Sequence, residues 1–241
     1  MKGNLFSFKT FKLLNETSAF KINTDGVLLG AWVDYTQTKK LLDIGTGGGV
    51  IAFIARHKSP DSEIAGIDID SESIKEACQN LILNNSCNIE FIHASVQEFA
   101  SKYKNEYDTV VSNPPFFLEG KTAALSSRKH IAKHQIRLSA ADLIHCSDKL
   151  LSPEGQFYCI YPESMQEHIL TLIDESNLSL KRLMRIKGKE GGPVSRIIFH
   201  ATKSTQSHVQ YFDLSIRKLE NNKALYTQQY IDLTKDLYLN F

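Results

Sequence analysis

The feature that most limits how this chain can fold is a glycine-rich loop between an apolar strand and a helix. Residues 40–44 are predicted to form a buried strand, because they are mainly apolar and run directly into glycines. The loop from Gly45 to Gly49 follows, and residues 51–57 are predicted to be helical. Glycine lets a backbone come close to a ligand, and the amino end of a helix favours the same contact. This order of elements predicts a nucleotide-binding unit of an α/β fold.

The spacing of the glycines favours a nucleoside that carries an amino acid over a dinucleotide. The dinucleotide fingerprint GxGxxG requires a third glycine at position 50, where this chain has Val50. Asp43 stands two residues before Gly45, and its carboxylate would repel a pyrophosphate but attract an amino group. A dehydrogenase is therefore disfavoured. A nucleotide-binding module without catalysis stays open as a different class of function.

A second carboxylate is placed to bind a ribose. Residues 64–70 predict the next strand, and Asp68 follows Gly45 by 23 residues. In nucleotide-binding βαβ units, an acid about 20 residues after the glycine loop binds the ribose hydroxyls. A solvated acid at a strand end is the alternative. A helix capped by Asp70 and Ser71 is then predicted over residues 72–84, with five residues expected to be buried: Ile74, Ala77, Cys78, Leu81 and Ile82.

The rest of the chain continues the alternation of strands and helices. Residues 89–93 predict a third strand, whose His93 is expected to pack rather than to act in catalysis. Residues 1–24 alternate as short strands do, and the helix predicted over residues 26–34 either packs on the core or covers a pocket. Further predictions are helices at 139–150 (with a capping box of Ser139 and Asp142), 163–176 and 228–239, strands at 156–161 and 211–216, and an edge hairpin of strands 180–186 and 195–201.

The sequence Asn113-Pro114-Pro115-Phe116 follows another buried strand, predicted over residues 109–111. Two prolines stop the strand and stiffen the turn, which leaves an amide side chain and bare carbonyls at a strand end. The Asn113 oxygen and the Pro114 carbonyl can accept both hydrogens of an exocyclic amine, while Phe116 stacks on its ring. In a parallel sheet with helices on both faces, ligands bind at the carboxyl ends of strands. We therefore expect this turn, the glycine loop and Asp68 to share one crevice.

The loop after this turn is strongly basic. Between Lys121 and Arg137 the chain has five Lys and Arg residues and two histidines, and no acid. A solvated loop is the ordinary interpretation of such a run. Its position beside the predicted catalytic turn instead favours contact with the phosphates of a polyanion.

Overall composition limits the remaining possibilities. The 241 residues are 42% hydrophobic with a net charge of +1, which allows a sizeable core and gives no overall attraction to nucleic acid. The four cysteines form no CxxC pair, so we expect reduced thiols in a cytosolic protein and no zinc site. No apolar run approaches the roughly 18 residues of a membrane span, and the first residues do not open a signal peptide.

These motifs together resemble a known family. Residues 43–49, Asp68 and residues 113–116 are similar to those of the Rossmann-like S-adenosylmethionine-dependent methyltransferases that act on planar amino groups. Residues 23–32 and the tail 226–239 extend the similarity over nearly the whole chain, toward bacterial enzymes that methylate N6 of adenine 37 in a valine tRNA. The resemblance implies a class I α/β fold: a seven-stranded, mostly parallel sheet with one antiparallel edge strand, helices on both faces and a short N-terminal extension. It also implies one domain over 1–241, with residues 1–38 covering the cofactor pocket and 39–241 forming the Rossmann-like core.

The resemblance further implies the cofactor, the partner and their ligands. The cofactor would be S-adenosyl-L-methionine and the partner a tRNA, in the cytoplasm and without a metal or a membrane. Asp43 would serve the amino group of the cofactor and Asp68 its ribose, while Asn113 and Pro114 would hold the substrate amine. The cofactor-binding residues would be Thr24, Asp25, Asp43, Gly45, Gly47, Gly49, Asp68, Ile69, Ser95, Val96 and Asn113. The catalytic residues would be Asn113, Pro114, Pro115 and Phe116, and the RNA-binding residues Lys121, Arg128, Lys129, Lys133, His134 and Arg137.

Two points stay open within this family. Members usually carry an acid after the third strand that binds the adenine amino group of the cofactor, and here that position is Ser95. Either Ser95 or a backbone group takes the role. The same turn also serves methylation of guanine N2 in ribosomal RNA, of adenine in DNA and of a protein glutamine, and Phe116 in place of tyrosine does not decide among them.

Overall fold

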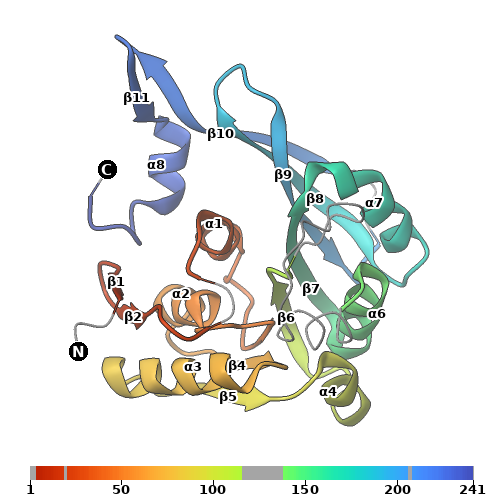
Figure 1. Cartoon of the computed structure of the whole chain (residues 1–241). Helices are drawn as coiled ribbons and strands as arrows, with labels where there is room; N and C mark the ends of the chain where they lie inside the picture. The colour runs from red at the N-terminus through yellow and green to blue at the C-terminus, as the bar shows by residue number, and fades with distance from the viewer. Residues whose placement is uncertain (1–3, 19–20, 116–137, 206–207, 241) are drawn as a thin grey trace, which may run out of the picture.

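The computed structural model of the chain describes residues 4–18, 21–115, 138–205 and 208–240 (Figure 1). Its centre is a sheet in which the described residues form nine strands, in the order β11-β10-β8-β9-β7-β6-β3-β4-β5. A separate hairpin of β1 (Leu5–Ser7) and β2 (Lys12–Leu14) lies near the N-terminus. The strands of the large sheet are β3 (Lys40–Ile44), β4 (Glu63–Asp68), β5 (Ile89–His93), β6 (Tyr107–Ser112), β7 (Leu151–Pro162), β8 (Ser179–Lys189), β9 (Val194–Thr202), β10 (Gln210–Glu220) and β11 (Lys223–Tyr226).

Helices cover both faces of this sheet, as expected. One core lies between the sheet and α1 (Thr24–Trp32), α2 (Val50–Lys58), α3 (Ser71–Asn84) and α8 (Gln228–Thr234), and it includes the β1–β2 hairpin. The other core lies under α4 (Val96–Lys102), α6 (Ala140–Leu150), the short 3₁₀ turn η1 (Glu163–Met165) and α7 (Gln166–Asp174). Among the described residues, no helix is both long and apolar enough to cross a membrane.

The sheet confirms the α/β class, but among the described residues it has nine strands rather than the expected seven, and its edge differs from the expected one. Strands β5, β4, β3, β6 and β7 are parallel, whereas β9 is antiparallel to β7 and to β8 on its other side. The β8–β9 hairpin is therefore not at the edge, because β9 lies inside the sheet and β10 pairs with β8 beyond it. Ile197, Ile198 and Phe199 are all fully buried, and an apolar run buried on both faces belongs in a sheet interior. The antiparallel edge strand is β11, whose four residues were not predicted as a strand.

The helix ends follow local capping chemistry. The Asn23 side chain accepts a hydrogen bond from Gly26 N at 2.9 Å and starts α1, which ends at Trp32 rather than at residue 34. Asp70 caps α3 in the same way, and Ser139 caps α6 by accepting from Asp142 N at 3.0 Å. The expectation that Ile82 is buried is wrong, because its side chain is 79% exposed. The buried face of α3 instead includes three polar residues, Ser73, Glu76 and Asn80.

Candidate active site

The ends of three neighbouring strands bring the predicted site residues together. Ile44 at the end of β3 is paired with Ile67 of β4 on one side and with Ser112 of β6 on the other. Because these strands are parallel, the glycine loop, Asp68 and Asn113 follow at the same edge of the sheet. The three therefore lie at the same ends of neighbouring strands, and the crevice that they would form stays a prediction.

The glycine loop adopts a conformation that explains the spacing of its glycines. Gly45, Gly47 and Gly49 have φ angles of 72°, 55° and 93°, in the left-handed region that favours glycine. The backbone N–H groups of Gly45 and Thr46 donate to the Ile67 carbonyl at 2.8 and 3.0 Å, which holds the loop against β4. Alternate glycines are thus required by the path of the loop.

Asp68 fixes the same loop from the neighbouring strand. Its Oδ2 accepts a hydrogen bond from Gly47 N at 2.9 Å and its Oδ1 accepts one from Asp70 N at 2.8 Å. Burial raises the pKa of Asp68, and these backbone hydrogen bonds oppose the effect. Each carboxylate oxygen keeps a further lone pair, so the group can also accept from ribose hydroxyls.

Asp43 is a fully buried carboxylate that is only partly satisfied. Its Oδ2 accepts a hydrogen bond from the Thr46 hydroxyl at 2.7 Å. Its Oδ1 has no hydrogen bond of normal geometry within the described part of the chain. Burial raises the pKa of Asp43 to about 7, opposed by the Thr46 bond and by the nearby Ala52 N–H of α2. An open acceptor of this kind fits an ammonium group or a water that bridges to one.

Asn113 is held between the sheet and the first turn of α1. The buried hydroxyl of Ser112 donates to the Ile44 carbonyl at 2.8 Å and ties the end of β6 to the end of β3. A Cβ atom placed on Gly26 would lie 3.3 Å from Nδ2 of Asn113, so α1 approaches this amide closely. Pro114 is buried and Pro115 is exposed. Phe116 and the expected RNA-binding residues 121–137 lie outside the described residues.

The two α1 residues expected at the cofactor differ in their contacts. Thr24 is exposed at the first position of the helix. Asp25 is partly buried and accepts a hydrogen bond from Arg196 Nε of β9 at 2.8 Å. This ion pair fixes the amino end of α1 to the sheet.

Ser95 and its neighbours follow the carboxyl end of β5. Ser95 caps α4 in a reciprocal capping box: its hydroxyl oxygen accepts from Glu98 N at 3.2 Å, and the Glu98 carboxylate accepts from Ser95 N at 3.2 Å and from the Ser95 hydroxyl at 2.8 Å. The Ser95 hydroxyl oxygen keeps one further lone pair, so Ser95 and a backbone group both stay open as the ligand of an adenine amine. Val96 is buried, and Ile69 is 43% exposed beside Asp68. The expectation that His93 packs inside is wrong: it is exposed, and its Nε2 lies 2.9 Å from the Ile69 carbonyl oxygen.

Sequence reasoning missed three residues that shape this site, namely Gly26, Thr46 and Ser112. Each acts through one contact with a residue distant in sequence or across a tight turn. A small or hydroxyl residue next to a motif is a weak sequence signal, because such residues are common in turns.

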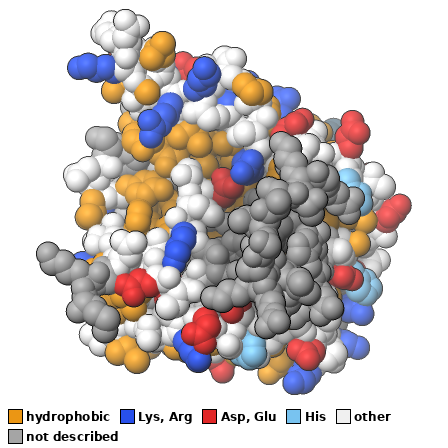
Figure 2. Space-filling model, in the orientation of Figure 1, with side chains coloured by type: hydrophobic (Ala, Val, Ile, Leu, Met, Phe, Trp, Pro, Cys, Tyr) orange, Lys and Arg blue, Asp and Glu red, His pale blue; other side chains and the backbone are white. Residues whose placement is uncertain are grey.

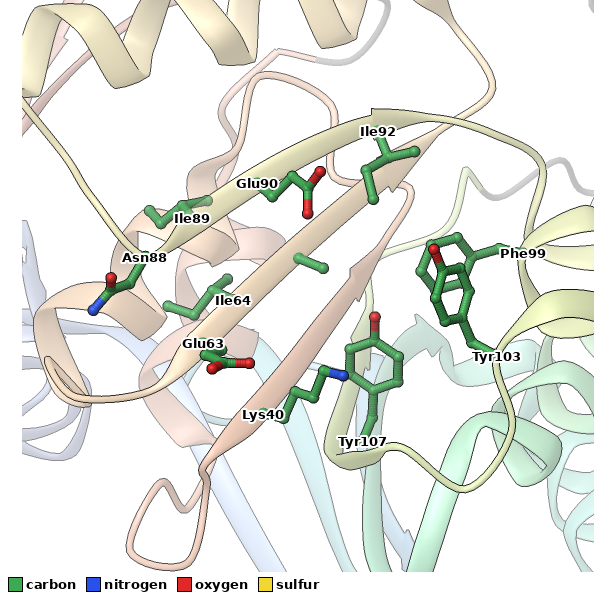
Figure 3. Close-up of a pocket in the computed structure, with 11 residues that line it drawn as sticks. Lys40, Glu63, Ile64, Asn88, Ile89, Glu90, Ile92, Phe99, Tyr103 and Tyr107 are labelled. Atoms are coloured by element: carbon green, nitrogen blue, oxygen red, sulfur yellow. The ribbon is translucent and has the colours of Figure 1, made fainter.

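A separate cavity of about 340 Å³ lies at the opposite ends of the strands (Figure 3). Lys40, Glu63 and Tyr107 come from the amino ends of β3, β4 and β6, and Phe99 of α4 and Tyr103, the residue after α4, close one side. None of the predicted site residues lines this cavity, so it does not belong to the candidate active site.

The comparisons with known proteins agree with this geometry. A family model described as "Methyltransferase small domain" matches residues 13–175, and the chain belongs to this family of methyltransferases. A solved structure from Agrobacterium tumefaciens, described as a predicted O-methyltransferase, has a TM-score of 0.68 at 17% identity and covers 88% of this chain and 96% of its own. That likeness confirms the fold.

Two curated relatives place the chain more narrowly. The tRNA1(Val) (adenine(37)-N6)-methyltransferase of Trichodesmium erythraeum is 34% identical, over 100% of both chains. The protein of the same name from Pseudoalteromonas translucida is 35% identical, over 97% of this chain and 98% of its own. Within the methyltransferases, the chain belongs to the family of the tRNA1(Val) (adenine(37)-N6)-methyltransferases.

Proposed function

We propose that the protein transfers the methyl group of S-adenosyl-L-methionine to N6 of adenine 37 in tRNA1(Val). The observation that carries the proposal is the adjacency of the glycine loop, with its open Asp43 acceptor, and Asn113 at paired strand ends. The first would hold a nucleoside that bears an amino acid, and the second a planar amine. The names of the full-length relatives support adenine in tRNA as that amine.

The site residues contribute to catalysis mainly by positioning the substrate amine, and less by acid–base chemistry. Asn113 Oδ1 and the Pro114 carbonyl accept the two N6 hydrogens, which orients a nitrogen whose lone pair is otherwise delocalised into the ring. Phe116 stacks on the base. The cofactor supplies a methyl group on a sulfonium, which needs no further activation. Correct in-line placement can contribute at most about 7–11 kcal/mol to lowering the barrier.

The cofactor would be held by the residues around the glycine loop. Asp43 binds its amino group, directly or through a water, and Asp68 binds its ribose hydroxyls. Ser95 or a backbone group near Ser95 and Val96 binds its adenine. The whole chain works as one methyltransferase domain in the cytoplasm, with residues 1–38 covering the cofactor over the core of residues 39–241.

Lysines near the carboxyl end of β8 would form part of the contact with the RNA. The three arginines of the β8–β9 hairpin have partners within the fold: Arg182 with His200, Arg185 with Asp213 and Arg196 with Asp25. Lys187 and Lys189 have no ion pair among the described residues. β8 runs in the same direction as β6 and β7, because β9, which lies between β7 and β8, is antiparallel to both of them. The carboxyl end of β8 therefore lies on the same side of the sheet as Asn113. Figure 2 shows further Lys and Arg side chains where β10 and β11 project.

Changing Lys187 and Lys189 together to Glu is expected to raise KM for tRNA about tenfold, since like charges would then face the phosphates. The Kd for S-adenosylhomocysteine should stay within twofold. Steady-state kinetics at two salt concentrations measure the effect, and the salt dependence of binding should also weaken. Lys39→Glu/Lys181→Glu is the matched control, because it makes the same charge change at the opposite ends of β3 and β8. Equal effects of the two double variants would contradict a local RNA contact.

The proposed reaction is tested by incubating the protein with labelled methyl donor and separate samples of tRNA, ribosomal RNA, DNA and protein. Nucleoside analysis should find N6-methyladenosine in tRNA only, at position 37 of tRNA1(Val). Methylated guanine in ribosomal RNA, methylated adenine in DNA or methylated glutamine would each replace the proposed substrate. Cofactor binding without transfer to any sample would favour a binding module.

A further inference from the structure

One side of α3 carries three polar residues spaced four apart, Glu76, Asn80 and Asn84. Glu76 is only 2% exposed and Asn80 is fully buried. Four residues of an α-helix rise by about 6 Å, and two residues of a strand rise by about 6.6–6.8 Å. Side chains at this helical spacing can therefore meet the alternate backbone groups of a strand that lies alongside.

The three side chains do meet such a strand, namely β2 and its continuation. Asn84 Oδ1 accepts from Lys12 N at 2.9 Å, and its Nδ2 donates to the Lys12 carbonyl at 2.7 Å. Asn80 Oδ1 accepts from Leu14 N at 2.7 Å. Glu76 Oε2 accepts from Glu16 N at 2.7 Å, from Thr17 N at 2.5 Å and from the Thr17 hydroxyl at 3.0 Å. The edge of β2 that does not pair with β1 is thus bonded to a helix instead of a strand.

Glu76 and Asn80 also contact the glycine loop, on the other side. Asn80 Nδ2 donates to the Gly48 carbonyl at 3.0 Å. A Cβ atom on Gly48 would lie 3.0 Å from Oε1 of Glu76, so the loop packs directly on this carboxylate. Asn84 has no contact of this kind with the loop among the described interactions. The same two buried side chains therefore hold the loop and residues 14–17 at once.

Residues 14–17 lie a few positions before α1, whose first turn packs against Asn113 through Gly26. We propose that Glu76 and Asn80 are positioning residues of the cofactor site, and that cofactor binding is coupled to the docking of residues 14–17 on α3. The inference rests on the proposed function only in taking the glycine loop as the place where S-adenosylmethionine binds. Coupling of two events through shared contacts is reciprocal, so each should strengthen the other.

Asn80→Ala is expected to weaken the binding of S-adenosylhomocysteine about tenfold, because a buried hydrogen bond to the loop is lost. Asn84→Ala is the matched control: it removes an amide from the same helix face and its two bonds to Lys12, but keeps the bonds of Asn80 and Glu76 to residues 14–17 and to the loop, so the Kd for S-adenosylhomocysteine should stay within twofold. Calorimetry on both variants, at a temperature where circular dichroism shows each to be folded, measures the difference. Equal loss in both variants, or no loss in Asn80→Ala, would overturn the inference.

If Asn80→Ala does not fold, Gly48→Ala tests the same contact from the loop. Gly48 has no left-handed φ, so the added methyl acts only through its approach to Glu76. An increase in Kd of about tenfold is expected from this overpacking. Gly188→Ala is its control, since a Cβ there meets nothing within 4 Å. An unchanged Kd for Gly48→Ala would reject the contact between loop and helix.

Hydrogen exchange tests the coupling itself. Adding S-adenosylhomocysteine should slow amide exchange at Leu14, Glu16 and Thr17 in the wild type, and less so in Asn80→Ala. Exchange unaffected by a bound ligand would contradict the coupling. These measurements need no RNA: if the cofactor binds and this coupling holds but tRNA is not methylated, only the proposed function fails.

Discussion

Asn113→Ala is expected to lower kcat for methyl transfer about a thousandfold, the upper range for removing one hydrogen-bonding group that acts on the reacting centre. The reason is geometric. The Asn113 oxygen would accept one N6 hydrogen and so aim the nitrogen at the methyl group, and alanine offers no acceptor. The Kd for S-adenosylhomocysteine should change by only a few-fold, because the glycine loop, Asp43 and Asp68 keep their contacts. Single-turnover kinetics with tRNA, and calorimetry for the cofactor, measure the two quantities separately.

Asn177→Ala provides the control for this variant. Asn177 also has a side-chain amide with a defined partner, the Asp148 carboxylate at 2.8 Å, but it lies after α7, outside the candidate site. It should lower stability without a comparable loss of kcat. If Asn113→Ala kept normal turnover, the amine would not be held at this turn and the site would have to be placed elsewhere.

Asp43→Asn is expected to weaken cofactor binding about a hundredfold at pH 8, because a buried carboxylate that accepts from an ammonium group makes a charge-assisted hydrogen bond. The variant nearly conserves shape, and its amide oxygen can still accept from the Thr46 hydroxyl. The pKa of Asp43 is raised to about 7 by burial, so the carboxylate form is lost as pH falls below 7. Wild-type cofactor binding should therefore weaken from pH 8 to pH 6, while binding by Asp43→Asn should be nearly independent of pH.

For the stability of the protein without its cofactor, the raised pKa of Asp43 leads to the opposite pH dependence. With its pKa raised above the unfolded value of about 3.9, the carboxyl holds a proton in the folded state that the unfolded chain releases. Its contribution to stability is greatest below pH 4 and is lost as pH rises through 7. Asp43→Asn should thus raise Tm relative to wild type more at pH 8 than at pH 5.

Asp148→Asn is the control for Asp43→Asn, because Asp148 is also a largely buried carboxylate but is paired with Lys203 and Asn177 away from the site. It should change Tm but not the affinity for S-adenosylhomocysteine. A loss of affinity equal to that of Asp43→Asn would mean that general destabilisation, rather than contact with the cofactor, explains both results.

Local sequence patterns predicted the part of the fold that carries the site. Residues 40–44 and 89–93 were predicted as strands with the bounds that the structure shows. Short apolar runs that end at glycine or polar turns are typical of strands. Asp70 was recognised as a cap because an Asp side chain before a helix can accept a hydrogen bond from a backbone N–H three residues away, as it does here from Ser73 N. The shared edge of Asp43, Asp68 and Asn113 followed from the alternation of strands and helices.

Pairing between elements that are distant in the sequence could not be predicted from such local patterns. The position of β9 between β7 and β8 was missed, although its apolar run Ile197-Ile198-Phe199 is typical of a strand that is buried on both faces. The role of Glu76 and Asn80 was missed because a polar face on a helix is normally solvated. Here β2 covers that face, and its own sequence gives no sign of this contact. Phe116 and the basic loop remain predictions from the sequence.

The central claim is that one crevice holds the cofactor on the glycine loop and the substrate amine at Asn113. A crystal structure of the protein with S-adenosylhomocysteine tests it most directly. We expect the ligand against Gly47 and Asp68, its amino group near Asp43 and its sulfur facing Asn113. A ligand bound away from Gly47 and Asp68, or with its sulfur remote from Asn113, would contradict the account.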